Sequence, residues 1–202
     1  MPQNVTLPVL HLASQSPRRK QLLEAIGIAF KAHLPKGVEE LHPAADEVDS
    51  VMIANARAKA RSISIERAED VALGADTLVC LNNEVLGKPR DPKHATEILQ
   101  KLSGKTQTVV TGLYLYSKKF GERSCLVKSE VTFKRLSADE ISQYTQTREP
   151  YDKAGAYAVQ GVGALFIEKI EGSYTNVMGL PIEAVMTELS ALTHIPIFEW
   201  FR

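Results

Sequence analysis

The chain has 202 residues, 44% of them apolar and 24% charged, which is the balance of a globular protein and excludes a collagenous, disordered or disulfide-scaffold chain. Lys and Arg together number 24, and so do Asp and Glu, so no overall field recruits nucleic acid or an anionic membrane. Any anion site must therefore be a local cluster of cations.

The sequence predicts a cytoplasmic protein. Its two cysteines, Cys80 and Cys125, are too few for a disulfide framework, so we expect a reducing compartment. Residues 1–8 lack the basic and apolar segments of a signal peptide, and no apolar run reaches the roughly 18 residues that a membrane span needs. We therefore expect neither a membrane nor nucleic acid as a partner.

Helices and strands alternate in the first half of the chain. Ser16 is placed to cap a helix whose first turn holds Pro17, and Gly27 is placed to end that helix. The hydrophobic pattern predicts, in chain order, a strand at 9–13, a helix at 17–26, a strand at 30–34, a helix at 47–68, a strand at 71–75 that continues to 81, a turn at 82–83, a strand at 84–86 and a helix from Asp91 to Gly104.

The second half opens with two long strands and closes with a helix. Ser137 and Glu140 form a capping-box signature. Interleaved helices and strands with one antiparallel hairpin predict an α/β fold, with a mixed twisted sheet flanked by helices, in a single domain over 1–202. The pattern predicts strands at 108–116 and 126–136 joined by a hairpin at 118–122, a helix at 138–144, a glycine-rich segment at 151–163, a strand at 164–170 and a helix at 181–192.

Two glycine motifs look like nucleotide-binding loops without meeting their requirements. Residues 103–106, Ser-Gly-Lys-Thr, look like the end of a P-loop, but Leu99 stands where the first glycine belongs and the motif follows a helix. Gly161 and Gly163 begin a dinucleotide-like pattern, but Phe166 replaces its third glycine. The five histidines include no pair at i and i+4, so zinc-hydrolase chemistry is not expected.

The first turn of the first predicted helix carries two arginines. Cations there oppose the helix dipole at a cost of about 0.3–1 kcal/mol each, so Arg18 and Arg19 need an explanation. They are either solvated side chains that tolerate this cost, or part of a site where the helix N-terminus and both guanidinium groups hold an anion. Ser14 and Ser16 add hydroxyl donors, and the whole set suits a polyphosphate.

Carboxylates and lysines supply the rest of such a site. Asp76 follows an apolar strand at its carboxyl end, where ligand clefts open in α/β sheets. It is either a turn residue or a carboxylate that holds a divalent metal or deprotonates a water. Glu39 and Glu40 offer further oxygen ligands of the kind that magnesium prefers. Lys59 and Lys88 are ordinary surface lysines when taken alone, but together with the carboxylates they suit a phosphate chain.

Residues 152–161, Asp-Lys-Ala-Gly-Ala-Tyr-Ala-Val-Gln-Gly, form a third cluster. Small residues let the backbone approach a ligand closely, while Lys153 offers a charge and Gln160 an amide. A mobile surface loop is the alternative, but such a loop needs neither this many small residues nor the tyrosines within it and before it. The composition therefore favours a binding segment.

Taken together, these clusters resemble the Maf-like nucleotide pyrophosphatases, and the resemblance runs from about Leu10 to Leu192. The five motifs that carry it occur in order: Leu-Ala-Ser-Gln-Ser-Pro-Arg-Arg at 12–19, Gly-Ala-Asp-Thr at 74–77, Gly-Lys-Pro at 87–89, the 152–161 segment, and Asn-Val-Met-Gly-Leu-Pro at 176–181. One small departure is Gln15, where glycine is common in the family; it leaves the serines and arginines intact.

The resemblance implies a two-lobed α/β fold, similar to that of inosine triphosphate pyrophosphatases, with the active site in the central cleft. It implies hydrolysis of nucleoside triphosphates to monophosphate and pyrophosphate, a divalent metal (magnesium or manganese), a house-cleaning role and often a homodimer. The Asp-Lys-Ala-Gly-Ala-Tyr motif resembles the branch that acts on dTTP and UTP. The alternatives are a 7-methyl-GTP pyrophosphatase and a nucleotide-binding regulator of cell division whose hydrolysis is incidental.

By matched position, Asp76 looks like the catalytic base, and Arg18, Thr77 and Gln160 look like the positions that set base specificity. We expect the metal on Asp76 and Glu40. The triphosphate and the leaving pyrophosphate would be stabilised by five cations: Arg18, Arg19, Lys59, Lys88 and Lys153.

Overall fold

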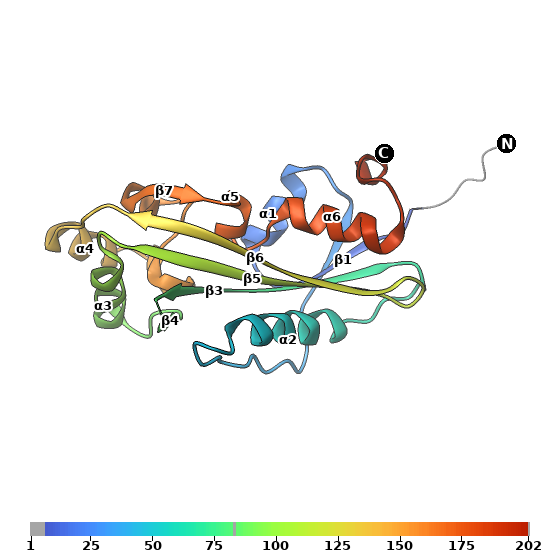
Figure 1. Ribbon diagram of the computed structural model, residues 1–202, viewed down its shortest axis with the longest axis horizontal. Coiled ribbons are helices and arrows are strands. Elements are labelled where there is room, and N and C mark those ends of the chain that lie inside the picture. Colours follow the sequence, from blue (N-terminus) through green and yellow to red (C-terminus); the bar gives the residue numbers. More distant parts are fainter. Residues whose placement is uncertain (1–6, 83, 202) are drawn as a thin grey trace.

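The structure, a computed structural model, describes residues 7–82 and 84–201. A seven-stranded sheet forms its centre, with the order β2-β1-β3-β5-β6-β7 and with β4 paired to β3 (Figure 1). The strands are β1 (Leu10–Ala13), β2 (Phe30–His33), β3 (Val71–Leu81), β4 (Glu84–Leu86), β5 (Thr106–Ser117), β6 (Gly121–Phe133) and β7 (Ile167–Glu171). β1 runs parallel to β2 and β3, and the other pairs are antiparallel, so the predicted mixed sheet is confirmed.

Helices cover both faces of this sheet (Figure 1). The α-helices are α1 (Pro17–Ala25), α2 (Val48–Arg61), α3 (Pro92–Leu102), α4 (Ala138–Thr145), α5 (Tyr174–Val177) and α6 (Ile182–Thr193). The 3-10 helices are η1 (Glu149–Asp152), η2 (Ala154–Ala156), η3 (Val162–Phe166) and η4 (Ile197–Phe201). Within the described ranges, no helix is both long and apolar enough to cross a membrane.

The long strands β3, β5 and β6 extend along the centre of the molecule (Figure 1), and they connect its two larger hydrophobic cores. One core packs α1 and α6 against the sheet and includes Leu12, Leu23 and Leu189, all fully buried. The other packs α3 and α4 against the far end of the same strands and includes Leu99 and Phe133. These two cores correspond to the expected two lobes, while the single-domain boundary 1–202 stays a prediction.

Local signals placed most helix ends correctly. The Asp91 side chain accepts a hydrogen bond from the His94 N–H at the start of α3, and both hydrogen bonds of the predicted capping box between Ser137 and Glu140 are present. Ser16 stands at the N-cap position of α1, but its side chain makes no capping hydrogen bond, which corrects that expectation. The turn predicted at 82–83 lies partly outside the described residues.

Two predicted elements were longer than those in the structure, and one short helix was missed. The helix predicted at 47–68 ends at Arg61, because the following segment buries Ile65 against α2 and β5 instead of continuing the helix. The strand predicted at 164–170 begins only at residue 167, since 162–166 form the 3-10 helix η3. The short helix α5 was not predicted; the Ser173 hydroxyl caps it.

Candidate active site

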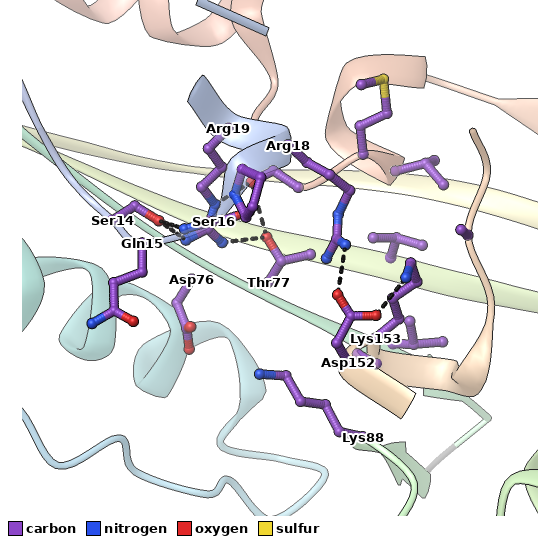
Figure 2. Close-up of a pocket in the computed structure, with 18 of the residues that line it drawn as sticks. Ser14, Gln15, Ser16, Arg18, Arg19, Asp76, Thr77, Lys88, Asp152 and Lys153 are labelled. Atoms are coloured by element: carbon purple, nitrogen blue, oxygen red, sulfur yellow. Dashed lines mark hydrogen bonds and ion pairs between the residues drawn. The ribbon is translucent and has the colours of Figure 1, made fainter. Parts of the chain in front are cut away.

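Eleven predicted site residues line one cavity of about 530 Å³, part of which Figure 2 shows, whereas Glu39, the other oxygen ligand that the sequence offered, is not in its lining. The cavity lies between the N-terminus of α1, the middle of β3 and the segment that follows η1. The predicted residues in its lining are Ser14, Ser16, Arg18, Arg19, Glu40, Lys59, Asp76, Thr77, Lys88, Lys153 and Gln160. The topology therefore brings together residues that are up to 146 positions apart in the sequence.

Asp76 lies within β3, not at its carboxyl end as the sequence suggested, because β3 continues to Leu81. The parallel partner β1 pairs with β3 only as far as Leu73, and the chain then turns into α1. Asp76 thus stands just beyond the parallel part of the sheet, where a cleft opens after β1 ends. The expectation that a ligand cleft opens beyond the carboxyl end of a strand therefore holds, but the strand that ends there is β1 and not β3.

Two glycines let α2 approach the sheet closely at this point. A Cβ atom on Gly74 would lie 2.0 Å from the Ala56 carbonyl oxygen, and one on Gly112, the β5 partner of Asp76, would lie 2.4 Å from the Met52 carbonyl oxygen. No side chain larger than hydrogen fits at either place. The close packing of α2 on β3 and β5 brings polar side chains of α2 to Asp76.

Lys59 and Asn55, both on α2, hold the two oxygens of the Asp76 carboxylate. The Lys59 Nζ lies 2.6 Å from Asp76 Oδ1, and the Asn55 Nδ2 donates to Asp76 Oδ2 at 2.8 Å. Asn55 is buried, and its amide also bonds the N–H and the carbonyl of Leu41, at 2.9 and 3.0 Å. One buried amide therefore fixes both Asp76 and the loop that carries Glu40.

Glu40 reaches the same lysine from the loop before α2. Its Oε1 lies 2.6 Å from Lys59 Nζ, so Lys59 bridges Glu40 and Asp76. Burial raises the pKa of the Glu40 carboxyl, but the hydrogen bond and charge of Lys59, with the charges of Lys88 and Arg19, outweigh burial and hold the pKa below its ordinary value. Glu40 is therefore a carboxylate at neutral pH.

The donor set fits a divalent cation that shares its coordination with a phosphate chain. The Glu40 and Asp76 oxygens on Lys59 lie no farther apart than twice 2.6 Å, and both carboxylates face the cavity. Among the described residues, no group of three or more His, Cys, Asp or Glu side chains forms a metal cage. Magnesium commonly takes one or two carboxylates and completes its shell with substrate phosphates and water, which matches this arrangement.

Arg19 uses most of its hydrogen-bond donors on other groups of the protein. Its Nε donates to the Gly179 carbonyl at 2.8 Å, and its Nη1 to the Ala75 carbonyl at 2.9 Å and to Ser14 Oγ at 3.3 Å. Its Nη2 donates to Thr77 Oγ1 at 3.1 Å (Figure 2). Burial lowers the pKa of Arg19, opposed by nearby carboxylates. With four of five donors used, Arg19 offers a phosphate at most one.

Arg18 points the other way, across the cavity. Its Nη1 lies 3.3 Å from Asp152 Oδ2 on η1, and Asp152 also pairs with Lys153 (Figure 2). Burial raises the pKa of Asp152, but the hydrogen bond and charge of Lys153, with Arg18, hold it below its ordinary value. Arg18 and Lys153, two of the five predicted phosphate cations, thus share the Asp152 carboxylate. An incoming anion would compete with Asp152 for both cations.

The Thr77 hydroxyl is already engaged by protein partners. It lies 2.9 Å from the Thr111 hydroxyl, 3.1 Å from Arg19 Nη2 and 3.3 Å from the Gly179 carbonyl oxygen. A hydroxyl has one proton and two lone pairs, so these contacts satisfy it. Thr77 lines the cavity, but its oxygen is part of the scaffold around Arg19.

The remaining predicted residues lie at the mouth of the cavity. Lys88 is exposed on the loop after β4 and points toward the side that carries Asp76 (Figure 2). Gln160 in the lining is also exposed, and Ser16 is half-buried at the start of α1. Asn55 was not predicted, because nothing local separates a buried helix asparagine from a solvated one, and Asp152 had no predicted role.

Two carboxylates and several cations line one cavity, a combination whose charges suit a polyanion. The profile of the family described as "Maf-like protein" matches residues 9–192, and the chain belongs to this family. Proteins of Escherichia coli K12 and Salmonella typhimurium LT2, both named dTTP/UTP pyrophosphatase, are each 45% identical to it, over 86% and 87% of this chain and 87% and 89% of theirs.

A solved structure also resembles the chain at low similarity. The nucleoside-triphosphatase, or dITP/XTP pyrophosphatase, of Mycobacterium abscessus is 13% identical, with a TM-score of 0.41 over 94% of this chain and 98% of that one. A likeness at this level carries no conclusion about activity. The family assignment rests on the profile and the relatives.

Proposed function

We propose that this protein is a nucleoside triphosphate pyrophosphatase that hydrolyses dTTP and UTP to the monophosphate and pyrophosphate. The observation that carries the proposal is the Asp76 carboxylate, held by Lys59 and Asn55 in the cavity that Arg18, Lys88 and Lys153 also line. The 45% identity to relatives named dTTP/UTP pyrophosphatase supports the same activity and substrates.

Asp76 is the residue we propose to activate the water. Lys59 and Asn55 fix the orientation of its carboxylate, and each oxygen keeps a lone pair beyond the one its partner uses. Asp76 can therefore accept a proton from, or orient, a water that attacks the α-phosphorus. The water oxygen bonds to phosphorus as the bond from the α-phosphorus to the bridging oxygen breaks, and pyrophosphate leaves with that oxygen.

The cations stabilise the charge that grows on the departing pyrophosphate. Lys88 and Lys153 face the cavity from one lobe and Arg18 from the other. Asp152 pairs with both Arg18 and Lys153, and phosphate oxygens would compete with its carboxylate for these contacts. A divalent cation on Glu40 and Asp76 would neutralise the phosphate oxygens when bound, and excess chelator should abolish activity until magnesium or manganese is returned.

Gln160 and Arg18 are the residues we propose to read the base. Thymine and uracil present an acceptor, a donor and an acceptor along one edge, and the Gln160 amide can accept from the ring N–H and donate to a carbonyl. The Arg18 guanidinium only donates, so it opposes the amino group of cytosine. Thr77 would act on specificity indirectly, through Arg19 and Gly179, because its hydroxyl is already bonded.

A hydrolysis screen over nucleoside triphosphates with identified products tests this function. We expect dTTP and UTP to be the best substrates, with dCTP and 7-methyl-GTP well behind, and monophosphate and pyrophosphate as the first products. Diphosphate with orthophosphate would refute the cleavage site. Higher catalytic efficiency on 7-methyl-GTP would overturn the pyrimidine assignment while leaving the cleavage chemistry intact.

The protein also belongs, in our proposal, to the cytoplasm and works as a homodimer. The cytoplasmic location rests on the cysteine usage, and the homodimer rests on the family resemblance. Light scattering gives the molar mass of the purified protein in solution and so tests the homodimer directly. A mass equal to that of one chain at working concentration would contradict it.

A further inference from the structure

Glu149, at the start of η1, binds the glycine turn that the sequence presents as a failed dinucleotide motif. Its Oε1 accepts from the Gly163 N–H at 2.8 Å and from the Tyr144 hydroxyl at 2.8 Å. Its Oε2 accepts from the Val162 N–H at 3.0 Å. Three donors from two segments thus converge on one half-buried carboxylate beside the cavity.

The two glycines of this turn leave room for these contacts. A Cβ on Gly161 would lie 2.1 Å from Glu149 Oε2, and a Cβ on Gly163 would lie 2.8 Å from the Tyr144 hydroxyl oxygen. Neither glycine has the positive φ that would require glycine for backbone reasons. The Gly-Val-Gly sequence is therefore explained by the close approach of Glu149 and Tyr144.

This arrangement connects directly to the residues that face the substrate. Gln160 immediately precedes the turn that Glu149 holds, and the Glu149 carbonyl accepts from Lys153 Nζ at 2.8 Å. Burial raises the pKa of Glu149, but the Gly163 N–H, the Tyr144 hydroxyl, the Val162 N–H and Lys153 together hold it below its ordinary value. The carboxylate is therefore ionised, and acts only as an acceptor, at neutral pH.

We propose that Glu149 is a positioning residue for base selection: it fixes the 161–163 turn so that the Gln160 amide meets the pyrimidine edge at one place and orientation. The inference rests on the proposed function, since it concerns how that site tells thymine and uracil from cytosine. An amide at an exposed rim discriminates between bases only if its backbone cannot shift to suit the wrong one.

The test compares Glu149→Gln with a matched control, Glu140→Gln. Glutamine keeps the size of Glu149, but its amide NH₂ must face a backbone N–H, so the turn loses at least one hydrogen bond. Glu140 is also a carboxylate held by a backbone N–H, a hydroxyl and a lysine, and it caps α4 outside the cavity lining. Steady-state kinetics with dTTP and dCTP, and thermal unfolding, are measured for both variants.

We expect Glu149→Gln to raise KM for dTTP about tenfold with kcat changed much less, and to lower the dTTP over dCTP preference by a similar factor. Glu140→Gln should lower the unfolding temperature and leave both the KM and the preference at wild-type values. A purely structural role for Glu149 would reduce the active fraction, which lowers kcat for both nucleotides equally and leaves KM and the preference unchanged.

A second variant keeps the inference testable if Glu149→Gln does not fold. Gly161→Ala places a methyl group against the Glu149 carboxylate and displaces it, so the same loss of preference is expected. Wild-type KM and preference in a folded Glu149→Gln or Gly161→Ala protein would overturn the inference, as would an equal loss in Glu140→Gln. A wild-type protein that hydrolyses no dTTP would instead refute the proposed function.

Discussion

At the scale of single residues, two adjacent arginines of the site have different hydrogen-bond partners. Arg18 and Arg19 are adjacent in the sequence, but Arg19 is buried and bonds α1 to β3 and to the Gly179 carbonyl, whereas Arg18 extends across the cavity to Asp152. The cost of two cations at a helix N-terminus is thus offset differently for each, by hydrogen bonds for one and by an ion pair for the other.

Asp76→Asn tests the proposed base. We expect turnover to fall by at least about a hundredfold, which is typical of losing a general base. The fold should survive because the change is nearly isosteric and Lys59 keeps its contact with Glu40. The rate of product formation from dTTP measures the turnover, and the urea unfolding midpoint measures whether the fold survives. A variant that retains most of its activity would remove Asp76 from the proposed mechanism.

Asn55→Ala tests the residue that holds both Asp76 and the Glu40 loop. Three hydrogen bonds of a buried amide are lost, so we expect the free energy of unfolding to fall by about 1–3 kcal/mol. Turnover should fall by about tenfold even where the variant is fully folded, because Asp76 Oδ2 is no longer fixed. Unchanged turnover in folded protein would show that Lys59 alone orients Asp76.

At the scale of elements, the packing of α2 on the sheet decides where the site chemistry lies. α2 supplies both partners of Asp76, and it can do so only because its backbone lies against Gly74 and Gly112. Helix, strand and site are therefore coupled through a backbone-to-backbone contact, which is less adaptable than a contact between side chains.

Gly74→Ala should disrupt this contact. The added methyl group would meet the Ala56 carbonyl oxygen at 2.0 Å, and a backbone atom cannot rotate away. We expect a loss of about 3 kcal/mol or more in the free energy of unfolding, at the upper end for overpacking, together with lower turnover as α2 is displaced. Gly87→Ala is the control, since a methyl group there would have no neighbour within 4 Å and the φ of Gly87 is not positive; an equal loss there would contradict the explanation.

The capping box of α4 gives a prediction about pH. The Ser137 N–H, Lys134 and the Ser137 hydroxyl lower the pKa of Glu140 to about 2, from 4.5 in an unperturbed chain. A depressed folded-state pKa stabilises the protein above the unfolded value and loses that contribution as pH falls toward the folded one. The stability gap between wild type and Glu140→Gln should therefore be largest at neutral pH and shrink between pH 4.5 and about 2. A gap that stays constant in urea titrations over this range would contradict the assignment.

At the scale of the whole molecule, the cavity is lined by both lobes. The ion pair between Arg18 on α1 and Asp152 on η1 spans it, and each lobe has its own hydrophobic core. A triphosphate bound between them would contact both lobes at once, so ligand binding should stabilise the protein as a unit.

A dTTP analogue that cannot be cleaved between its α- and β-phosphates tests this expectation. At a concentration of 100 times Kd, it should stabilise the wild type by about 2.7 kcal/mol, seen as a rise in the unfolding temperature. Arg18→Ala should lose most of this rise at the same concentration, because a contact to the nucleotide from one lobe is gone. Arg123→Ala, which removes an ion pair with Glu188 outside the cavity lining, should keep it. An equal loss in both variants would argue against a specific contact.

The sequence by itself determined the features that depend on near neighbours. The caps of α3 and α4 and the hairpin between β5 and β6 follow from residues a few positions apart, and each of the five family motifs is a short run of residues. Eleven candidate site residues were also found from the sequence, nine of them in four of these motifs, and these eleven line one cavity. Their individual roles stay predictions.

Only the tertiary structure decided which partner each of these side chains has. Arg19 meets the Gly179 carbonyl 160 positions away and Arg18 meets Asp152 134 positions away, and no local pattern distinguishes the two arginines beforehand. In the sequence, Asn55 and Glu149 look like ordinary helix and loop residues. In the folded protein, Asn55 bonds the Asp76 carboxylate on β3, and Glu149 bonds the glycine turn at 161–163. Local propensity is set within a turn or two of chain, whereas burial and hydrogen-bond partners depend on segments that meet only in the folded protein.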